Sequence, residues 1–151
     1  MFEQFRSFMG EIGYPPEKIR PLTFATYGDY ARAYLNREVM LITTGWTMDY
    51  PDAENTMQLF YGPNATPGSN SANYDNPEYD ALTEELAQTA VLEERAALVI
   101  QMNDMLMQEY VILPLTYRGR NSAHANSLGG VILNVWYSEL WNIADWYRTD
   151  N

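Results

Sequence analysis

The amino-acid sequence predicts an α/β fold in which a mixed sheet is flanked by helices. Residues 39–44 form a nearly continuous, β-branched apolar run, which is typical of a strand buried on both faces of a sheet. A helical pattern precedes this run, and residues 19–25 before it read as another strand. A strand, a helix and a strand in this order imply a right-handed parallel crossover. We therefore expect a sheet containing residues 22–25, 39–44 and 113–117.

Apolar periodicity and capping residues predict four longer helices. The first has apolar residues at intervals of three and four and stops at a glycine. Thr26, with Asp29 three residues later, resembles a capping box that opens the second helix. Asn76 offers an N-cap to the third, with Pro77 at its first helical position. The fourth, over residues 93–109, is expected to bury the following side chains: Leu98, Val99, Met102, Met105 and Leu106.

Composition excludes several classes of function. The 151 residues fit one domain, and 46% apolar with 19% charged residues is the balance of a globular protein. Nine basic against twenty acidic residues give a net charge of -11, which repels nucleic-acid phosphates. The absence of cysteine excludes disulfides and thiolate chemistry. No apolar run reaches the roughly 18 residues that cross a bilayer, so we expect no membrane span.

The most informative segment is GWTMDYPDAEN, residues 45–55, which follows the predicted buried strand. In open α/β sheets, ligands bind outside the carboxyl ends of strands. Trp46 and Asp49 can there supply an apolar wall and an anionic anchor, which suits a ligand with a cationic head. Spacing alone leaves a second interpretation open, in which Trp46 belongs to the core and Asp49 caps the next helix. A short helix is expected over residues 53–60.

Motifs along nearly the whole chain, in order, resemble the carboxy-terminal lobe of the oligopeptide- and dipeptide-binding proteins of ABC importers, solute-binding protein family 5. The motifs are Gly45-Trp46, Asp49, Tyr50-Pro51-Asp52, the box NYDNPEYD at residues 73–80, Glu94-Arg95 and ILPL at residues 112–115. The resemblance implies a periplasmic-binding-protein-like (type II) lobe, with residues 1–151 as a single partial domain that lacks the amino-terminal lobe. It implies capture of a peptide-like or related small solute in an interlobe cleft, without catalysis, a cofactor or a protein-bound metal. Members of the class also carry nickel complexes, sugars and opines, so the class does not fix the ligand.

The same resemblance implies roles for individual residues. Asp49 matches the aspartate that accepts the ligand's α-ammonium, and Trp46 matches the tryptophan that lines the pocket beside it. Tyr117 falls on the strand that presents an aromatic ring to the ligand. Arg118 and Arg120 follow and would meet a ligand carboxylate, although both also read as solubilising surface charges. The residue three positions before Trp46 is a threonine, which argues against the arginine clamp that some peptide binders carry.

The implied partners are the solute and the ABC permease subunits, and the implied location is periplasmic or otherwise extracytoplasmic. The first residues carry no secretion leader, so the chain is cytoplasmic, already processed or a piece of a longer chain. Self-association of an isolated lobe is also expected, since its half-cleft would face water.

Two classes of function other than transport fit parts of the sequence. One alternative is a self-contained protein-interaction module with aromatic-rich loops. Another is a glycosidase with a carboxylate pair drawn from Asp49, Asp52 and Glu54, but nothing else in the chain supplies substrate subsites. His124 is the only histidine and has no second His or Cys to form a metal site with it.

Overall fold

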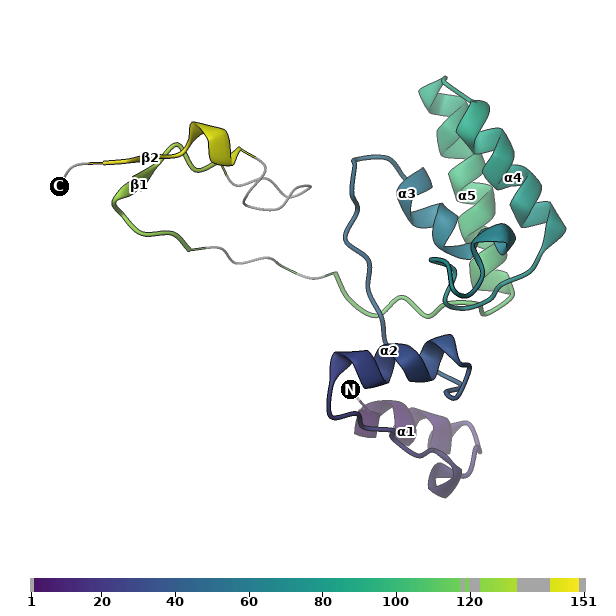
Figure 1. Ribbon diagram of the computed structural model, residues 1–151. Coiled ribbons are helices and arrows are strands. Elements are labelled where there is room, and N and C mark those ends of the chain that lie inside the picture. Colours follow the sequence, from purple (N-terminus) through teal and green to yellow (C-terminus); the bar gives the residue numbers. More distant parts are fainter. Residues whose placement is uncertain (1, 118, 120–122, 133–141, 150–151) are drawn as a thin grey trace. The chain divides into compact units, whose positions relative to one another are not determined.

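A computed structural model describes residues 2–117, 119, 123–132 and 142–149, and within them the chain is mostly helical (Figure 1). The α-helices are α1 (Phe2–Glu11), α2 (Tyr27–Leu35), α3 (Glu54–Met57), α4 (Pro77–Gln88) and α5 (Leu92–Gln108). Single 3-10 turns are η1 (Pro16–Lys18), η2 (Gln58–Phe60), η3 (Gly62–Asn64) and η4 (Ile143–Asp145). The two strands are β1 (Leu128–Gly129) and β2 (Tyr147–Arg148).

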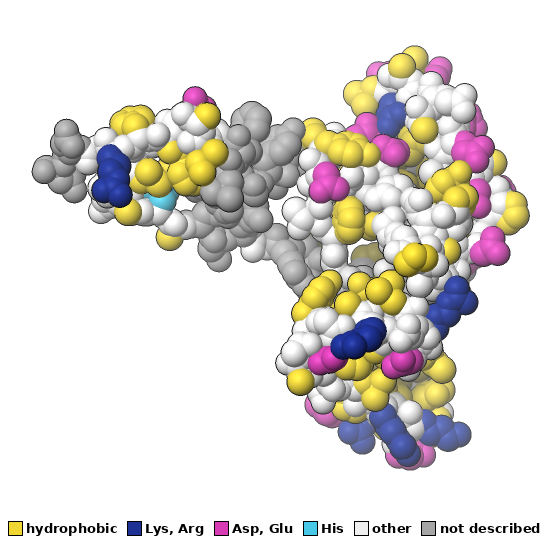
Figure 2. All heavy atoms as spheres, viewed as in Figure 1, with side chains coloured by type: hydrophobic (Ala, Val, Ile, Leu, Met, Phe, Trp, Pro, Cys, Tyr) yellow, Lys and Arg dark blue, Asp and Glu magenta, His cyan; other side chains and the backbone are white. Residues whose placement is uncertain are grey.

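The predicted α/β fold is wrong for the part of the chain that the structure describes. Its sheet consists of β1 and β2 alone, paired antiparallel, and residues 22–25, 39–44 and 113–117 form no strand. A strand buried on both faces needs neighbours that complete its hydrogen bonds and cover its side chains. Here Met40 is 96% exposed and Leu113 is 68% exposed, so neither segment has that cover. Figure 2 shows hydrophobic side chains of this kind at the surface among the charged ones.

The chain divides into two compact units, Met1–Thr43 and Thr44–Asn151. The first unit contains α1 and α2, which confirms both helices predicted there. At the end of α1, Gly13 adopts a φ of 87°, a left-handed conformation that favours glycine. Thr26 caps α2, since its hydroxyl oxygen accepts a hydrogen bond from the Asp29 amide at 3.1 Å. Of residues 2–43, the part of this unit that the structure describes, only Ala33 is buried.

The second unit has its core between α3, α4 and α5, and Figure 1 shows α4 and α5 side by side. Asn76 caps α4 as predicted, because its side-chain oxygen accepts hydrogen bonds from the Glu78 amide at 2.9 Å and the Tyr79 amide at 3.4 Å. The buried side chains recur at helical spacing on facing sides of the helices. They are Met57, Tyr79, Leu82, Leu86, Met102 and Leu106. Full burial of one such aliphatic side chain stabilises the fold by about 1.5–3 kcal/mol.

The predicted apolar face of α5 is confirmed, and its side chains differ in how deeply they are buried. Met102 and Leu106 are fully buried, whereas Leu98, Val99 and Met105 pack against the core while partly exposed. The short helix predicted over residues 53–60 is present as α3 followed by η2.

The loop between η3 and α4 is held by Asn70, which is completely buried. Its side-chain amide donates hydrogen bonds to the carbonyls of Tyr61 at 3.1 Å and Tyr74 at 2.9 Å, and its oxygen accepts one from the Tyr74 amide at 3.2 Å. A polar side chain can be buried at low cost only when it is bonded in this way. The loop thereby returns the chain to the start of α4.

The carboxy-terminal hairpin pairs Leu128 with Arg148 and Gly129 with Tyr147. Buried Asn142 donates a hydrogen bond to the Gly130 carbonyl at 2.7 Å and accepts one from the Trp146 indole at 3.0 Å. None of the helices that the structure describes combines the length and apolar character required to cross a bilayer.

Candidate ligand-binding site

Two of the residues predicted to bind ligand, Trp46 and Asp49, are brought together by the buried side chain of Asn55. The Asn55 oxygen accepts hydrogen bonds from the Trp46 indole nitrogen at 2.7 Å and from the Asp49 amide at 3.1 Å. Its amide nitrogen donates to the Asp49 carboxylate at 3.4 Å. Asn55 is only 3% exposed and lies in α3, so the helix fixes the group around which the loop turns.

Both predicted groups remain open to solvent. Trp46 is 46% exposed and Asp49 is also exposed, although the polar edge of the indole is already bonded. The second interpretation, in which Trp46 belongs to the core and Asp49 caps the next helix, is therefore wrong, because Trp46 lies outside the core. Asp52, and not Asp49, binds the start of α3, where its carboxylate accepts a hydrogen bond from the Glu54 amide at 2.9 Å.

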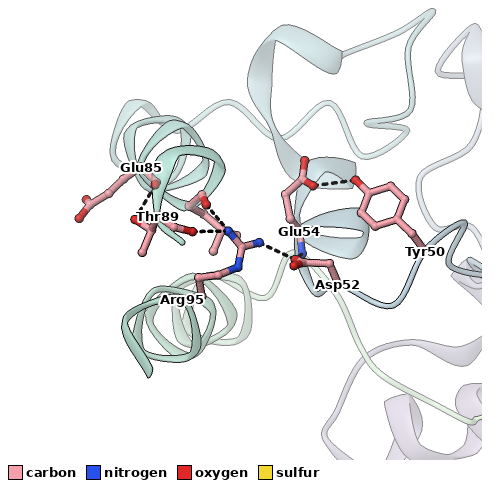
Figure 3. A network of polar contacts seen from close by, with 7 residues as sticks. Tyr50, Asp52, Glu54, Glu85, Thr89 and Arg95 are labelled. Carbon is pink, nitrogen blue, oxygen red and sulfur yellow. Dashed lines mark hydrogen bonds and ion pairs between the residues drawn. The ribbon is translucent and has the colours of Figure 1, made fainter. Parts of the chain in front are cut away.

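An ion pair attaches this loop to the helices of the core. The Arg95 guanidinium lies 2.6 Å from the Asp52 carboxylate and also donates to the carbonyls of Leu86 at 2.5 Å and Thr89 at 2.7 Å (Figure 3). The side chain of Arg95 is 18% exposed and that of Asp52 is 38% exposed. The loop is thus tied to the end of α4 through a residue of α5.

Local contacts shift the pKa values of two side chains in the loop. Burial acts to raise the pKa of Asp52, but the Glu54 amide and the Arg95 guanidinium outweigh it, so the pKa lies below its usual value. The hydrogen bond from its hydroxyl to the Glu54 carboxylate, at 2.6 Å, raises the pKa of Tyr50. Asp52 therefore stays charged, and its ion pair persists, throughout the neutral range.

The other three predicted residues are not joined to this site. Tyr117 is fully exposed, and among the described residues no contact connects it with Trp46 or Asp49. Arg118 and Arg120 lie outside the described residues.

A separate cavity of about 370 Å³ lies beside the loop, and none of the predicted ligand-binding residues lines it. Its wall includes two tyrosines, and each donates a hydrogen bond to a glutamate: Tyr50 to Glu54 at 2.6 Å and Tyr61 to Glu84 at 3.0 Å. These polar groups satisfy one another. No cluster of metal-ligating side chains occurs in the part of the chain that the structure describes.

Sequence reasoning missed Asn55 and the ion pair of Asp52 with Arg95. A signal for Asn55 was its place in a predicted short helix directly after the loop, where an inward-facing amide can bond loop groups. For the ion pair no local signal exists, since the two residues are 43 positions apart.

No protein-family model matches the chain, and comparisons with curated proteins and with solved structures yield no match. A function can therefore be inferred only from the residues of the chain itself.

Proposed function

We propose that this chain is part of the substrate-binding component of an ABC importer and binds a peptide-like or related small solute through the solute's ammonium group. The observation that carries the proposal is the pairing of exposed Trp46 and exposed Asp49 around buried Asn55. The ordered motifs that resemble peptide-binding proteins support the same function.

The chemistry of the pair suits an ammonium ion. An exposed carboxylate accepts charge-assisted hydrogen bonds from it, each worth about 1.5–3 kcal/mol. The face of an indole ring attracts the same cation by about 0.5–2 kcal/mol. Because Asn55 already holds the Trp46 ring and the Asp49 amide, less side-chain freedom is lost when a ligand binds.

The rest of the proposal concerns partners. An amino-terminal lobe supplies the other side of the cleft, and permease subunits receive the loaded protein outside the cytoplasm. Exposed Trp46 belongs to the surface that the other lobe covers, and the isolated chain uses that surface to self-associate.

The first prediction tests the ammonium anchor with Asp49→Asn in the full-length gene product. Titration calorimetry with trialanine and with N-acetyl-trialanine measures affinity with and without a free ammonium. We expect the substitution to weaken trialanine binding more than tenfold, since the ammonium loses its charged acceptor, and to leave N-acetyl-trialanine unaffected. Asp75→Asn, at an exposed aspartate outside the loop, is the matched control. Equal trialanine affinity in wild type and Asp49→Asn would contradict an ammonium anchor.

A second candidate function is a self-contained protein-interaction module. The observation in its favour is a row of exposed apolar side chains beyond α5, at Leu113, Leu115 and Tyr117. This function predicts that a partner protein binds with an affinity that Tyr117→Ser lowers, and that trialanine does not bind at all.

A further inference from the structure

We infer that Arg95 is a positioning residue for the Trp46 and Asp49 site, although it contacts neither of them. That Trp46 and Asp49 form a binding site rests on the proposed function. The contacts that link Arg95 to these two residues do not depend on that function. They run from Arg95 to the Asp52 carboxylate, from the Asp52 carbonyl to the Asn55 backbone amide, and from the Asn55 side chain to Trp46 and Asp49.

The first step is the anchoring of Arg95. One nitrogen of its guanidinium donates to the carbonyls of Leu86 and Thr89 at the carboxy-terminal end of α4. Carbonyls at that end of a helix need donors from elsewhere, and the helix dipole favours a cation there. Because Arg95 belongs to α5, its guanidinium is held by both helices of the core and has little freedom to move.

The second step joins this anchor to α3. The other terminal nitrogen of Arg95 binds one carboxylate oxygen of Asp52, and the same oxygen accepts the Glu54 amide. The Asp52 carbonyl also accepts a hydrogen bond from the Asn55 amide at 3.1 Å. The turn that precedes α3, and with it the backbone of Asn55, is therefore placed by Arg95 (Figure 3).

The third step is the transfer of this placement to the exposed pair. The Asn55 side chain is almost completely buried and supplies one acceptor for both Trp46 and Asp49. A displaced α3 moves that acceptor, which releases the indole ring and the Asp49 amide together. A lysine cannot reproduce the anchor, since its single ammonium lacks the planar fork that reaches α4 and Asp52 at once.

The experiment uses three single variants of the full-length gene product: Arg95→Met, Arg95→Lys and Asp52→Asn. A double variant combines Arg95→Met with Asp52→Asn. Arg32→Met is the control, because Arg32 also pairs with an aspartate, Asp29, at 2.7 Å but on the exposed surface of α2. Two readouts are compared at a temperature where circular dichroism shows folded protein. They are the trialanine affinity and the fluorescence of Trp46, taken as the difference from the same variant carrying Trp46→Phe.

We expect Arg95→Met to weaken trialanine binding at least tenfold and to shift the Trp46 emission to longer wavelength. Arg95→Lys should show a smaller change of the same sign, and the effects of Arg95→Met and Asp52→Asn should not add. Arg32→Met should change neither readout. Lower stability with unchanged affinity and unchanged Trp46 emission would overturn the inference.

The outcomes separate this inference from the proposed function. If wild type does not bind trialanine but Arg95→Met shifts the Trp46 emission, the proposed function fails and the positioning role stands. Should Arg95→Met fail to fold, the decision rests on Arg95→Lys and Asp52→Asn. Unchanged Trp46 emission in both of these variants would then overturn the role.

Discussion

Buried asparagine side chains hold two loops of the second unit, one before α3 and one between η3 and α4. Asn55 forms hydrogen bonds with the loop before α3, and Asn70 forms hydrogen bonds with the loop between η3 and α4. An amide suits this task because it carries both donors and an acceptor without a charge, so burial does not require a counter-ion. The same physical device shapes the candidate site and closes the loop behind it.

The residue-scale prediction is that Asn70→Asp destabilises the second unit. The substitution replaces the donor that serves the Tyr61 and Tyr74 carbonyls with an acceptor. The Tyr74 carbonyl then loses its donor, whereas the Tyr61 carbonyl keeps its hydrogen bond from the Asn64 amide, so we expect the free energy of unfolding to fall by about 1–3 kcal/mol. Urea unfolding followed by circular dichroism measures it. Asn103→Asp, on the exposed face of α5, should change the stability little, and an equal loss in both variants would contradict the prediction.

At the scale of the elements, α4 and α5 form the stable part of the second unit. Their buried residues fall on the apolar stripes that sequence periodicity predicts, and α3 packs on both helices through Met57. The site is therefore a loop attached to a packed helix pair, in which Arg95 of α5 and Asn55 of α3 are the points of attachment. Loops that carry function are commonly held by a rigid scaffold in this way.

The element-scale prediction compares two methionines of α5. Met102 is fully buried between the helices, whereas Met107 is 39% exposed. We expect Met102→Ala to lower the free energy of unfolding by about 2–5 kcal/mol, because it removes buried apolar surface and leaves a cavity. Met107→Ala should stay within about 0.5 kcal/mol of wild type. Thermal and urea unfolding of both variants measure these free energies. Similar losses of stability in the two variants would show that the core lies elsewhere.

For the whole molecule, burial is unequal between the two units. Residues 2–43 bury only Ala33, while α4 and α5 contain four of the completely or nearly completely buried large side chains: Tyr79, Leu86, Met102 and Leu106. Because local opening is easiest where few apolar contacts are buried, the two units should differ in stability.

We predict that the amides of α1 and α2 exchange with deuterium faster than those of α4 and α5. Hydrogen exchange measured by mass spectrometry on the native chain tests this, with rates corrected for the intrinsic exchange of each peptide. A uniform protection across the four helices would contradict the prediction, since it would require a cooperative unit that includes residues 2–43.

Local chemistry in the sequence was sufficient to predict the helices and two of their caps, and it singled out Trp46 and Asp49 as neighbours in one loop. Thr26 and Asn76 cap helices where their positions indicate, and Trp46 and Asp49, three residues apart, lie around one amide. A helix bonds each residue to one four positions away, and a cap bonds one two or three positions away. Such partners can be read from neighbouring residues.

Only the tertiary structure decided whether the apolar runs pair into a sheet, and which residues hold the site. Residues 39–44 have the composition of a buried strand, but a strand requires a partner from elsewhere in the chain, and none of the described residues supplies one. The attachment of the site by Arg95 to Asp52 was equally hidden, because it joins residues 43 positions apart. Composition indicates which groups need partners, whereas folding in three dimensions determines which partners they meet.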